Sequence, residues 1–145
     1  EVIMIDTLST VGGLFVLLGF NHFVVDWVFQ THKEAMLKST NWRYRARHCF
    51  VYMLGFLPIL LLMGLEPWEL GVAQAILFFS HFIEDTYIPV YLWAKHIRRI
   101  PGIRLDGIMA FKSEFGHPLG LMLFVAIDQI IHLLFLFPLI YLAMV

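Results

Sequence analysis

Four long stretches of this chain carry almost no charge, and this constrains the fold more than any other feature. They cover residues 7–30, 48–65, 70–94 and 117–143. A helix needs about 20 apolar residues to cross roughly 30 Å of hydrocarbon, so each stretch is long enough, the second being near the lower limit. We therefore predict an all-α, polytopic four-helix transmembrane bundle that forms a single domain over residues 1–145.

The composition supports a membrane location. The chain is 60% hydrophobic and only 14% charged, whereas a soluble domain carries about a quarter charged residues, so a water-soluble globule is excluded. A single cysteine, Cys49, excludes a disulfide scaffold, and a net charge of −1 excludes nucleic-acid binding through bulk charge. The short alternating strands of a transmembrane barrel are absent from the sequence, which leaves helices.

The basic residues indicate the orientation of the bundle. All ten Lys and Arg fall within residues 33–47 and 95–112. By the positive-inside rule these are two basic cytoplasmic loops, so we expect both termini outside. The first span lacks the features of a signal peptide, and we expect it to remain part of the bundle. Prolines at 58, 89 and 138 lie within the spans and predict local kinks.

Four acidic residues lie inside the predicted spans: Asp26, Glu84, Asp85 and Asp128. An ionised carboxylate near the bilayer centre costs several kcal/mol unless a partner compensates it. The spans themselves contain no Lys or Arg. We therefore expect the compensating group to be a proton, a histidinium or a bound metal cation.

Histidines accompany the acidic residues at a fixed spacing. Each of three spans carries a His and an Asp four residues apart: His22 and Asp26, His81 and Asp85, and Asp128 and His132. This spacing places both side chains on one helical face. Counting residues from the cytoplasmic ends brings the three pairs, together with His48, to a similar depth in the cytoplasmic half of the membrane.

Neutral imidazole and carboxylate oxygen together are ligands for zinc, manganese or iron. We predict a site for a divalent metal, with zinc as the expected element, as one or two ions. The predicted ligands are His22, Asp26, His81, Asp85, Asp128 and His132. Three protein ligands plus a water would make the site hydrolytic. The predicted catalytic residues are Asp85 or Glu84 as general base, and His48 as outer ligand or proton shuttle.

Other functions fit the same residues. The polar side chains can serve as hydrogen bonds between helices, or line the path of a metal or proton carrier. A third alternative is a small subunit of a larger membrane complex that binds haem between two histidines, although an Asp one turn from each His disfavours haem. The expected partners are the lipid bilayer, a lipid-like ester or phosphoester substrate, and further copies of the chain or a larger membrane complex, with no nucleic acid.

The order of these motifs resembles a known family. The motifs are His22-x-x-x-Asp26-Trp27-x-x-Gln30, Lys33, His48, Ser80-His81-x-x-x-Asp85 and Asp128-Gln129-x-x-His132. Together they resemble the small bacterial membrane family known as domain of unknown function 3307. The pattern is also distantly similar to bacterial membrane-bound metal-dependent hydrolases, whose His/Asp-lined sites are similar to those of zinc-dependent phospholipases. The resemblance implies a multi-pass protein of the bacterial inner (cytoplasmic) membrane, and it moderately favours hydrolysis.

Overall fold

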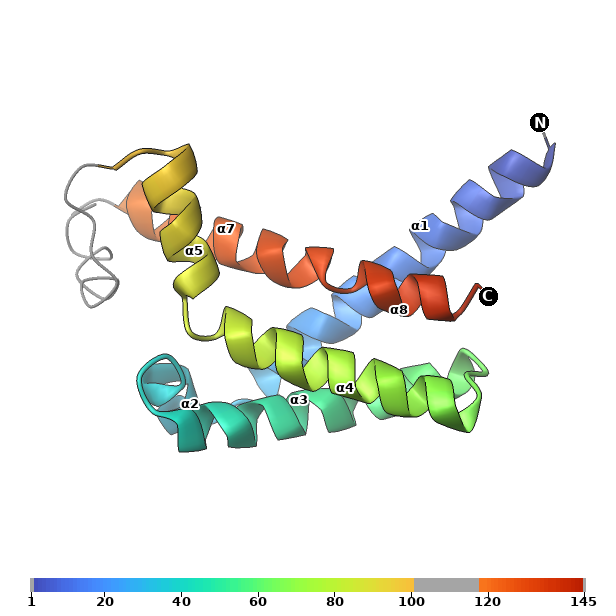
Figure 1. The fold of residues 1–145 in the computed structure, drawn as a ribbon, viewed down its shortest axis with the longest axis horizontal. Coiled ribbons are helices and arrows are strands. Elements are labelled where there is room, and N and C mark those ends of the chain that lie inside the picture. Colours follow the sequence, from blue (N-terminus) through green and yellow to red (C-terminus); the bar gives the residue numbers. More distant parts are fainter. Residues whose placement is uncertain (1, 101–117, 145) are drawn as a thin grey trace.

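The computed structural model describes the backbone of residues 2–100 and 118–144, and the side chains of residues 7–100 and 122–144. Every element in this part of the chain is helical (Figure 1), which confirms the all-α class. The elements are α1 (Val2–Phe23), the π-helical turn η1 (Val24–Val28), α2 (His32–Leu37), α3 (Trp42–Leu62), α4 (Pro67–Glu84), α5 (Ile88–Leu92), the π-helical turn η2 (Trp93–Ile97), α7 (Pro118–Leu134) and α8 (Phe137–Leu142).

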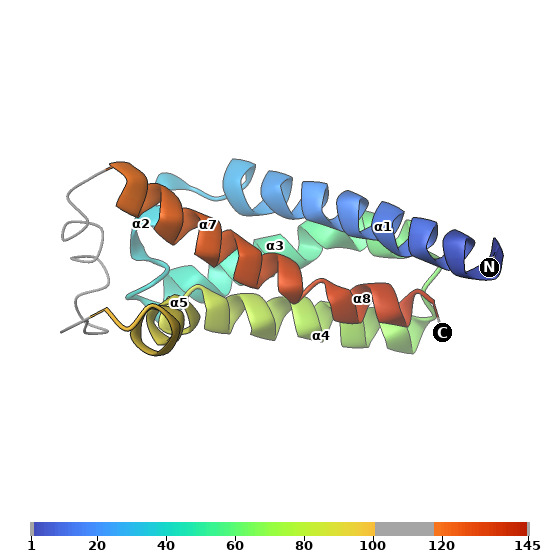
Figure 2. The same cartoon turned by 90° about the horizontal axis from the view of Figure 1, so that it is seen from above.

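The long helices run lengthwise through the molecule. Helices α3, α4 and the α7–α8 pair follow the long axis, α1 crosses it obliquely in Figure 1, and α4 packs against both α3 and α7–α8 (Figures 1 and 2). The two ends of the chain and the α3–α4 turn lie at one end, whereas α2 and α5 lie at the other. The sidedness of these ends in a membrane stays a prediction.

Three helical segments of the described residues are long and apolar enough to cross a membrane. They are Thr7–Val28, Trp42–Leu62 and Met122–Leu142. Large apolar side chains are exposed along them, as lipid-facing residues are: Val16 is 70% exposed and Leu62 86%. Helix α4 is less apolar because it carries two glutamates, a glutamine and a histidine, so its crossing of the membrane stays a prediction.

Two of the predicted spans are interrupted near prolines. The span predicted over residues 70–94 divides because α4 ends at Glu84 and Tyr87 adopts a left-handed φ of 60° before α5 begins with Pro89 in its first turn. Proline lacks an amide hydrogen and constrains the residue before it, so a helix tends to restart there. The span predicted over residues 117–143 divides likewise between α7 and α8, just before Pro138. Helix α3 continues through Pro58.

Two apolar clusters lie on either side of a buried polar layer. The larger cluster joins α1, α3, α4 and α8 through buried residues such as Leu18, Phe56, Leu77 and Leu139. The smaller one forms around Val90, in α5, with η2 and α7. The polar layer between them contains the acidic and histidine side chains of the sequence motifs, which burial here shields from water and lipid.

Candidate metal centre

Side chains from η1, α3, α4 and α7 meet in the polar layer. Seven of the residues singled out in the sequence are at most 3% exposed: His22, Asp26, His48, His81, Glu84, Asp85 and His132. The eighth, Asp128, has a side chain that is 15% exposed. The structure therefore encloses most of these side chains, whereas their depth in a membrane stays a prediction.

Local helix geometry directs the carboxylates inward. Asp26 lies within η1, where α1 widens into a π turn, a distortion that is frequent at functional sites. Glu84 and Asp85 lie three and four residues after His81 at the end of α4, so both carboxylates lie on the side of the helix that carries His81. This explains how two adjacent acidic residues both reach the buried layer.

Two groups of three side chains each bring potential metal ligands together. Asp26, His48 and His81 form the first group, and His81, Asp85 and His132 form the second; within each, the ligand atoms lie within 4.8 Å of one another. In the first group, His48 Nε2 lies 2.9 Å from both Asp26 Oδ1 and His81 Nε2. In the second, Asp85 Oδ2 lies 3.5 Å from His81 Nε2. His81 belongs to both groups, so the two form one continuous centre.

The hydrogen bonds of His132 identify its free ring nitrogen. Nδ1 lies 2.8 Å from the carbonyl oxygen of Asp128, and a carbonyl can only accept, so Nδ1 carries the proton. A neutral His132 therefore has a lone pair on Nε2, and within the described residues this atom makes no hydrogen bond. It lies 3.3 Å from Glu84 Oε2 and 3.9 Å from Asp85 Oδ1. A lone pair facing carboxylates requires a proton or a cation between them, and a backbone bond at Nδ1 is typical of metal-binding histidines.

Other buried ligand atoms in this layer also lack hydrogen bonds. Among the described residues these are His81 Nδ1, Glu84 Oε1 and Asp85 Oδ2. Buried polar atoms are satisfied in most proteins because each unpaired one costs about 1–3 kcal/mol. Several such atoms within one small volume fit a site that takes up a cation.

The structure also brings a lysine into the centre, which corrects the expectation that only a proton, a histidinium or a metal compensates the carboxylates. Lys38 Nζ lies 2.8 Å from Asp85 Oδ1, 3.2 Å from Asp26 Oδ1 and 3.2 Å from His48 Nε2. The residue is 7% exposed, although the sequence places it in a basic loop. Its long side chain reaches from the end of α2 into the polar layer.

The position of Lys38 follows from the fixed geometry of α2. Thr31 caps this helix, accepting from the backbone N–H of Glu34, while Glu34 Oε2 accepts from the backbone N–H of Thr31 at 2.7 Å. Glu34 also pairs with Arg47 at 3.2 Å, and Arg45 donates to the Lys38 carbonyl at 3.1 Å. These contacts tie α2 to the start of α3, which holds the Lys38 backbone beside the centre.

The surroundings of Lys38 and Glu34 stabilise the charged forms of both side chains. Burial alone would lower the pKa of Lys38, but the charges of Asp85 and Asp26 outweigh it and raise the pKa above its ordinary value. Burial would raise the pKa of Glu34, but hydrogen bonds from Thr31 and the charge of Arg47 lower it below its ordinary value. Lys38 is therefore a permanent cation at neutral pH.

His22 and Asp128 lie in neither group of ligands. His22 Nε2 donates to Gln129 Oε1 at 3.0 Å, and His22 Nδ1 accepts from the Tyr52 hydroxyl at 2.9 Å, so both ring nitrogens are in hydrogen bonds. The Tyr52 ring stacks on His81, with centroids 3.8 Å apart and planes within 10°. Asp128 Oδ2 lies 4.0 Å from His132 Nδ1. The ligand roles of His22 and Asp128 stay predictions.

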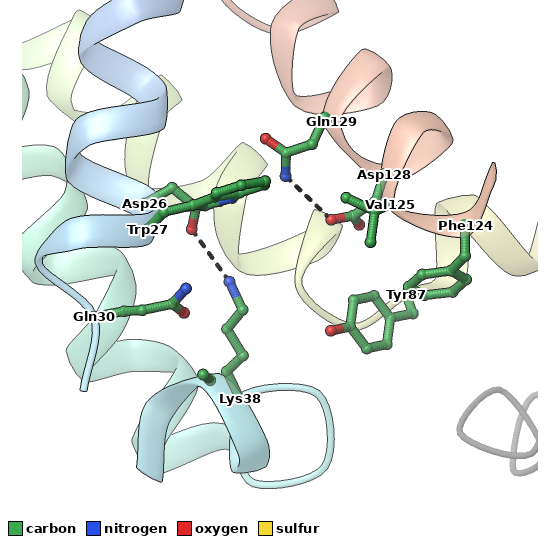
Figure 3. A pocket seen from close by; sticks show the side chains of 10 residues that line it. Asp26, Trp27, Gln30, Lys38, Tyr87, Phe124, Val125, Asp128 and Gln129 are labelled. Carbon is green, nitrogen blue, oxygen red and sulfur yellow. Dashed lines mark hydrogen bonds and ion pairs between the residues drawn. The ribbon is translucent and has the colours of Figure 1, made fainter. Parts of the chain in front are cut away.

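A cavity of about 160 Å³ leads to the centre from the side of η1, α2, α5 and α7. Figure 3 shows Asp26 and Lys38 on one side of it and Asp128 with Gln129 on the other. Its lining comprises Asp26, Trp27, Gln30, Ala35, Lys38, Tyr87, Phe124, Val125, Asp128 and Gln129. The cavity thus reaches the edge of the buried centre at Asp26 and Lys38.

The sequence alone did not single out Lys38 or Tyr52. In the sequence, Lys38 looks like any other lysine of a basic loop. Only the short helix before it could have indicated that its side chain points into the bundle. Tyr52 lies four residues after His48, on the same helical face, and this spacing is the available signal. The histidines His32 and His96, by contrast, are exposed.

Fold and site together define a helical protein of membrane type that encloses a buried His/Asp centre able to hold a metal ion. The family model described as Protein of unknown function (DUF3307) matches residues 14–145, so the chain belongs to this family. This confirms the family resemblance found in the sequence. No curated protein and no solved structure matches the chain. The similarity to metal-dependent hydrolases stays a prediction.

Proposed function

We propose that this chain is an integral membrane metalloprotein that hydrolyses an ester or phosphoester bond in a lipid-like substrate. The observation that carries the proposal is the position of His132 Nε2, which faces Glu84 and Asp85 without a hydrogen bond within the described residues. A metal ligand in this position explains both the orientation of the imidazole and the two carboxylates opposite it.

In this proposal His81, Asp85 and His132 bind a divalent ion, with zinc as the expected element. Their donor set of two imidazoles and one carboxylate is typical of catalytic zinc, which leaves a position for water. A bound zinc ion supplies a nucleophile by lowering the pKa of its water towards 7. The ligand groups support this coordination because their atoms lie within 4.8 Å of one another.

Glu84 is the proposed general base. It lies outside both ligand groups, and among the described residues its Oε1 makes no hydrogen bond, so this oxygen is available to accept a proton from water. The water oxygen bonds to the acyl carbon or phosphorus, the ester bond breaks, and Glu84 returns the proton to the departing oxygen. His48 passes protons between this centre and the cavity, or serves as an outer ligand.

The membrane setting selects the substrate class. In the proposed topology α4 crosses the bilayer beside the three apolar segments, both termini are outside, and the basic loops face the cytoplasm of a bacterial cell. The cavity then opens near the cytoplasmic surface, where a lipid headgroup can enter while its acyl chains stay in the bilayer. Exposed arginines such as Arg47, whose side chain is 67% exposed, support binding of anionic headgroups there.

Hydrolysis and metal analysis of the detergent-purified chain test the proposal. We expect bound zinc, and hydrolysis of phospholipid or phosphoester substrates that chelator abolishes and added zinc restores. His132→Ala and Asp128→Ala should reduce hydrolysis, whereas His32→Ala, at an exposed histidine of α2, should not. Hydrolysis that is indifferent to chelator, or a metal-free protein without activity, would refute it.

A metal or proton carrier is the second candidate. The observation that favours it is the polar cavity, where Asp128 and Gln129 face Asp26 and Lys38 across a route to the buried centre. Uptake of metal ions or protons into liposomes that contain the protein distinguishes a carrier from a hydrolase. Metal or proton flux that Asp128→Asn abolishes, without hydrolysis of any ester, would establish transport.

A further inference from the structure

We propose that Lys38 is a built-in cation of the centre, whose ammonium occupies one of two cation positions, so that a single divalent ion binds at the other. The inference rests on the proposed metal centre and deepens it by fixing how many ions bind and where. The lysine position lies between Asp26, His48 and Asp85. The metal position lies between His81, Asp85 and His132.

The first position already holds a positive charge. An ammonium group has three hydrogens, and Lys38 Nζ lies within 3.2 Å of two carboxylate oxygens that accept from it, Asp26 Oδ1 and Asp85 Oδ1, and of His48 Nε2. Asp26 and His48 belong to the first group of potential metal ligands. Lys38 is therefore bound as a metal would be, by two carboxylates and an imidazole.

The second position is different because the ammonium contacts only one of its three ligands, Asp85. Within the described residues, His132 Nε2 has no hydrogen bond, and its nearest charged neighbour is Glu84 Oε2 at 3.3 Å. Asp85 lies between the two positions, since its Oδ1 is 2.8 Å from Lys38 Nζ and 3.9 Å from His132 Nε2. One carboxylate thus faces both cations.

The buried charges balance for one divalent ion. Asp26, Glu84 and Asp85 are at most 3% exposed and carry three negative charges when ionised. Lys38 balances one of them, and a divalent cation balances the other two. A second divalent ion beside Lys38 would leave an excess of positive charge in a buried site, which is strongly unfavourable.

The backbone of Lys38 is held in place, so the ammonium is a fixed part of the centre. Its amide donates to the Glu34 carbonyl at 2.8 Å, and its carbonyl accepts from Arg45 at 3.1 Å. Glu34 is itself fixed by Thr31 and Arg47. The order of this segment supports a permanent electrostatic role, comparable to that of a second metal ion.

The experiment counts metal ions in the purified chain after chelator treatment and reloading with zinc, by elemental analysis. We expect one ion per chain in the wild type and two in Lys38→Met, because the substitution frees the first position and the four carboxylates, now counting the partly exposed Asp128, balance two divalent ions. Lys33→Met, at an exposed lysine of the same helix, is the matched control and should keep one. Two ions in the wild type, or equal counts in the wild type and a folded Lys38→Met, would overturn the inference.

A second comparison remains decisive if Lys38→Met does not fold. With Lys38 present, His132→Ala should lose the ion because it removes a ligand of the metal position, whereas His48→Ala should keep it. The opposite result, or loss in both variants, overturns the assignment of the two positions. Absence of metal from the wild type as well would instead refute the proposed metalloprotein, so the two failures are distinguishable.

Discussion

Removal of one hydroxyl group, by Tyr52→Phe, tests whether the buried hydrogen bonds around His22 support the centre. The hydroxyl donates to His22 Nδ1 at 2.9 Å, and His22 is completely buried. The phenyl ring can keep its stacking on His81, where the centroids are 3.8 Å apart, so the substitution opens no large cavity. Its effect should therefore come from the unpaired nitrogen of His22.

The expected cost is about 1–2 kcal/mol, within the range for a buried polar group left without a partner. It exceeds the ~0.6 kcal/mol average of hydrogen bonds between transmembrane helices, because the nitrogen that loses its donor is fully buried. The unfolding equilibrium should shift by about 5- to 30-fold, since 1.4 kcal/mol is a factor of ten. In a His22→Ala background, Tyr52→Phe should change the free energy of unfolding much less than it does in the wild type. A double-mutant cycle measures this difference.

Cys49 provides the assay. It is the only cysteine of the chain and is completely buried, so a thiol-reactive fluorescent maleimide reports unfolding in detergent. Tyr141→Phe is the matched control because Tyr141 is 68% exposed. Equal stability of Tyr52→Phe and the control, or additive effects with His22→Ala, would refute the supporting role of this bond. Loss of metal in His22→Ala but not in Tyr52→Phe would instead favour His22 as a ligand.

Three further predictions concern packing, pH and metal removal. Gly55→Ala would place a Cβ 2.5 Å from Val25 Cγ1, so we expect lower stability that Val25→Ala restores in the double variant; no such rescue would contradict this close contact. Because hydrogen bonds from Thr31 and a nearby arginine lower the pKa of Glu34 below 4.5, its contribution to stability is present above pH 4.5 and is lost as the pH falls through the folded pKa. Glu34→Gln should therefore be less stable than the wild type at pH 7, and the difference in stability should disappear in acid. A difference that stays constant with pH would contradict this reasoning. Chelator should lower the unfolding temperature of the wild type but not of His132→Ala, and equal shifts would argue against metal binding there.

The sequence predicted the helical class and the meeting of the motifs because both depend on local patterns. Apolar stretches of sufficient length form helices in almost any arrangement. The i, i+4 spacing of His81 and Asp85 places both side chains on one face of the helix. Both residues belong to the centre in the structure, as does His132.

Helix ends limited the rest of the interpretation. The sequence predicted one uninterrupted helix over residues 70–94, whereas α4 ends at Glu84 and α5 begins at Ile88, so the course of the chain after Asp85 was not predicted. Asp26 lies in a π turn, whose wider hydrogen bonding changes the direction of the following side chains. Such interruptions depend on the contacts of neighbouring helices, which no periodicity in one segment can reveal.

Lys38 shows why charges in a membrane protein cannot be paired by counting residues within spans. The spans contain four carboxylates and no basic residue, which suggests a metal or a proton as the partner. A lysine just outside a span can still reach inside, because its long apolar stem lies in the protein while the ammonium finds its acceptors. Lys38 neutralises one of the buried negative charges in this way, so fewer of them are left for a bound cation to balance.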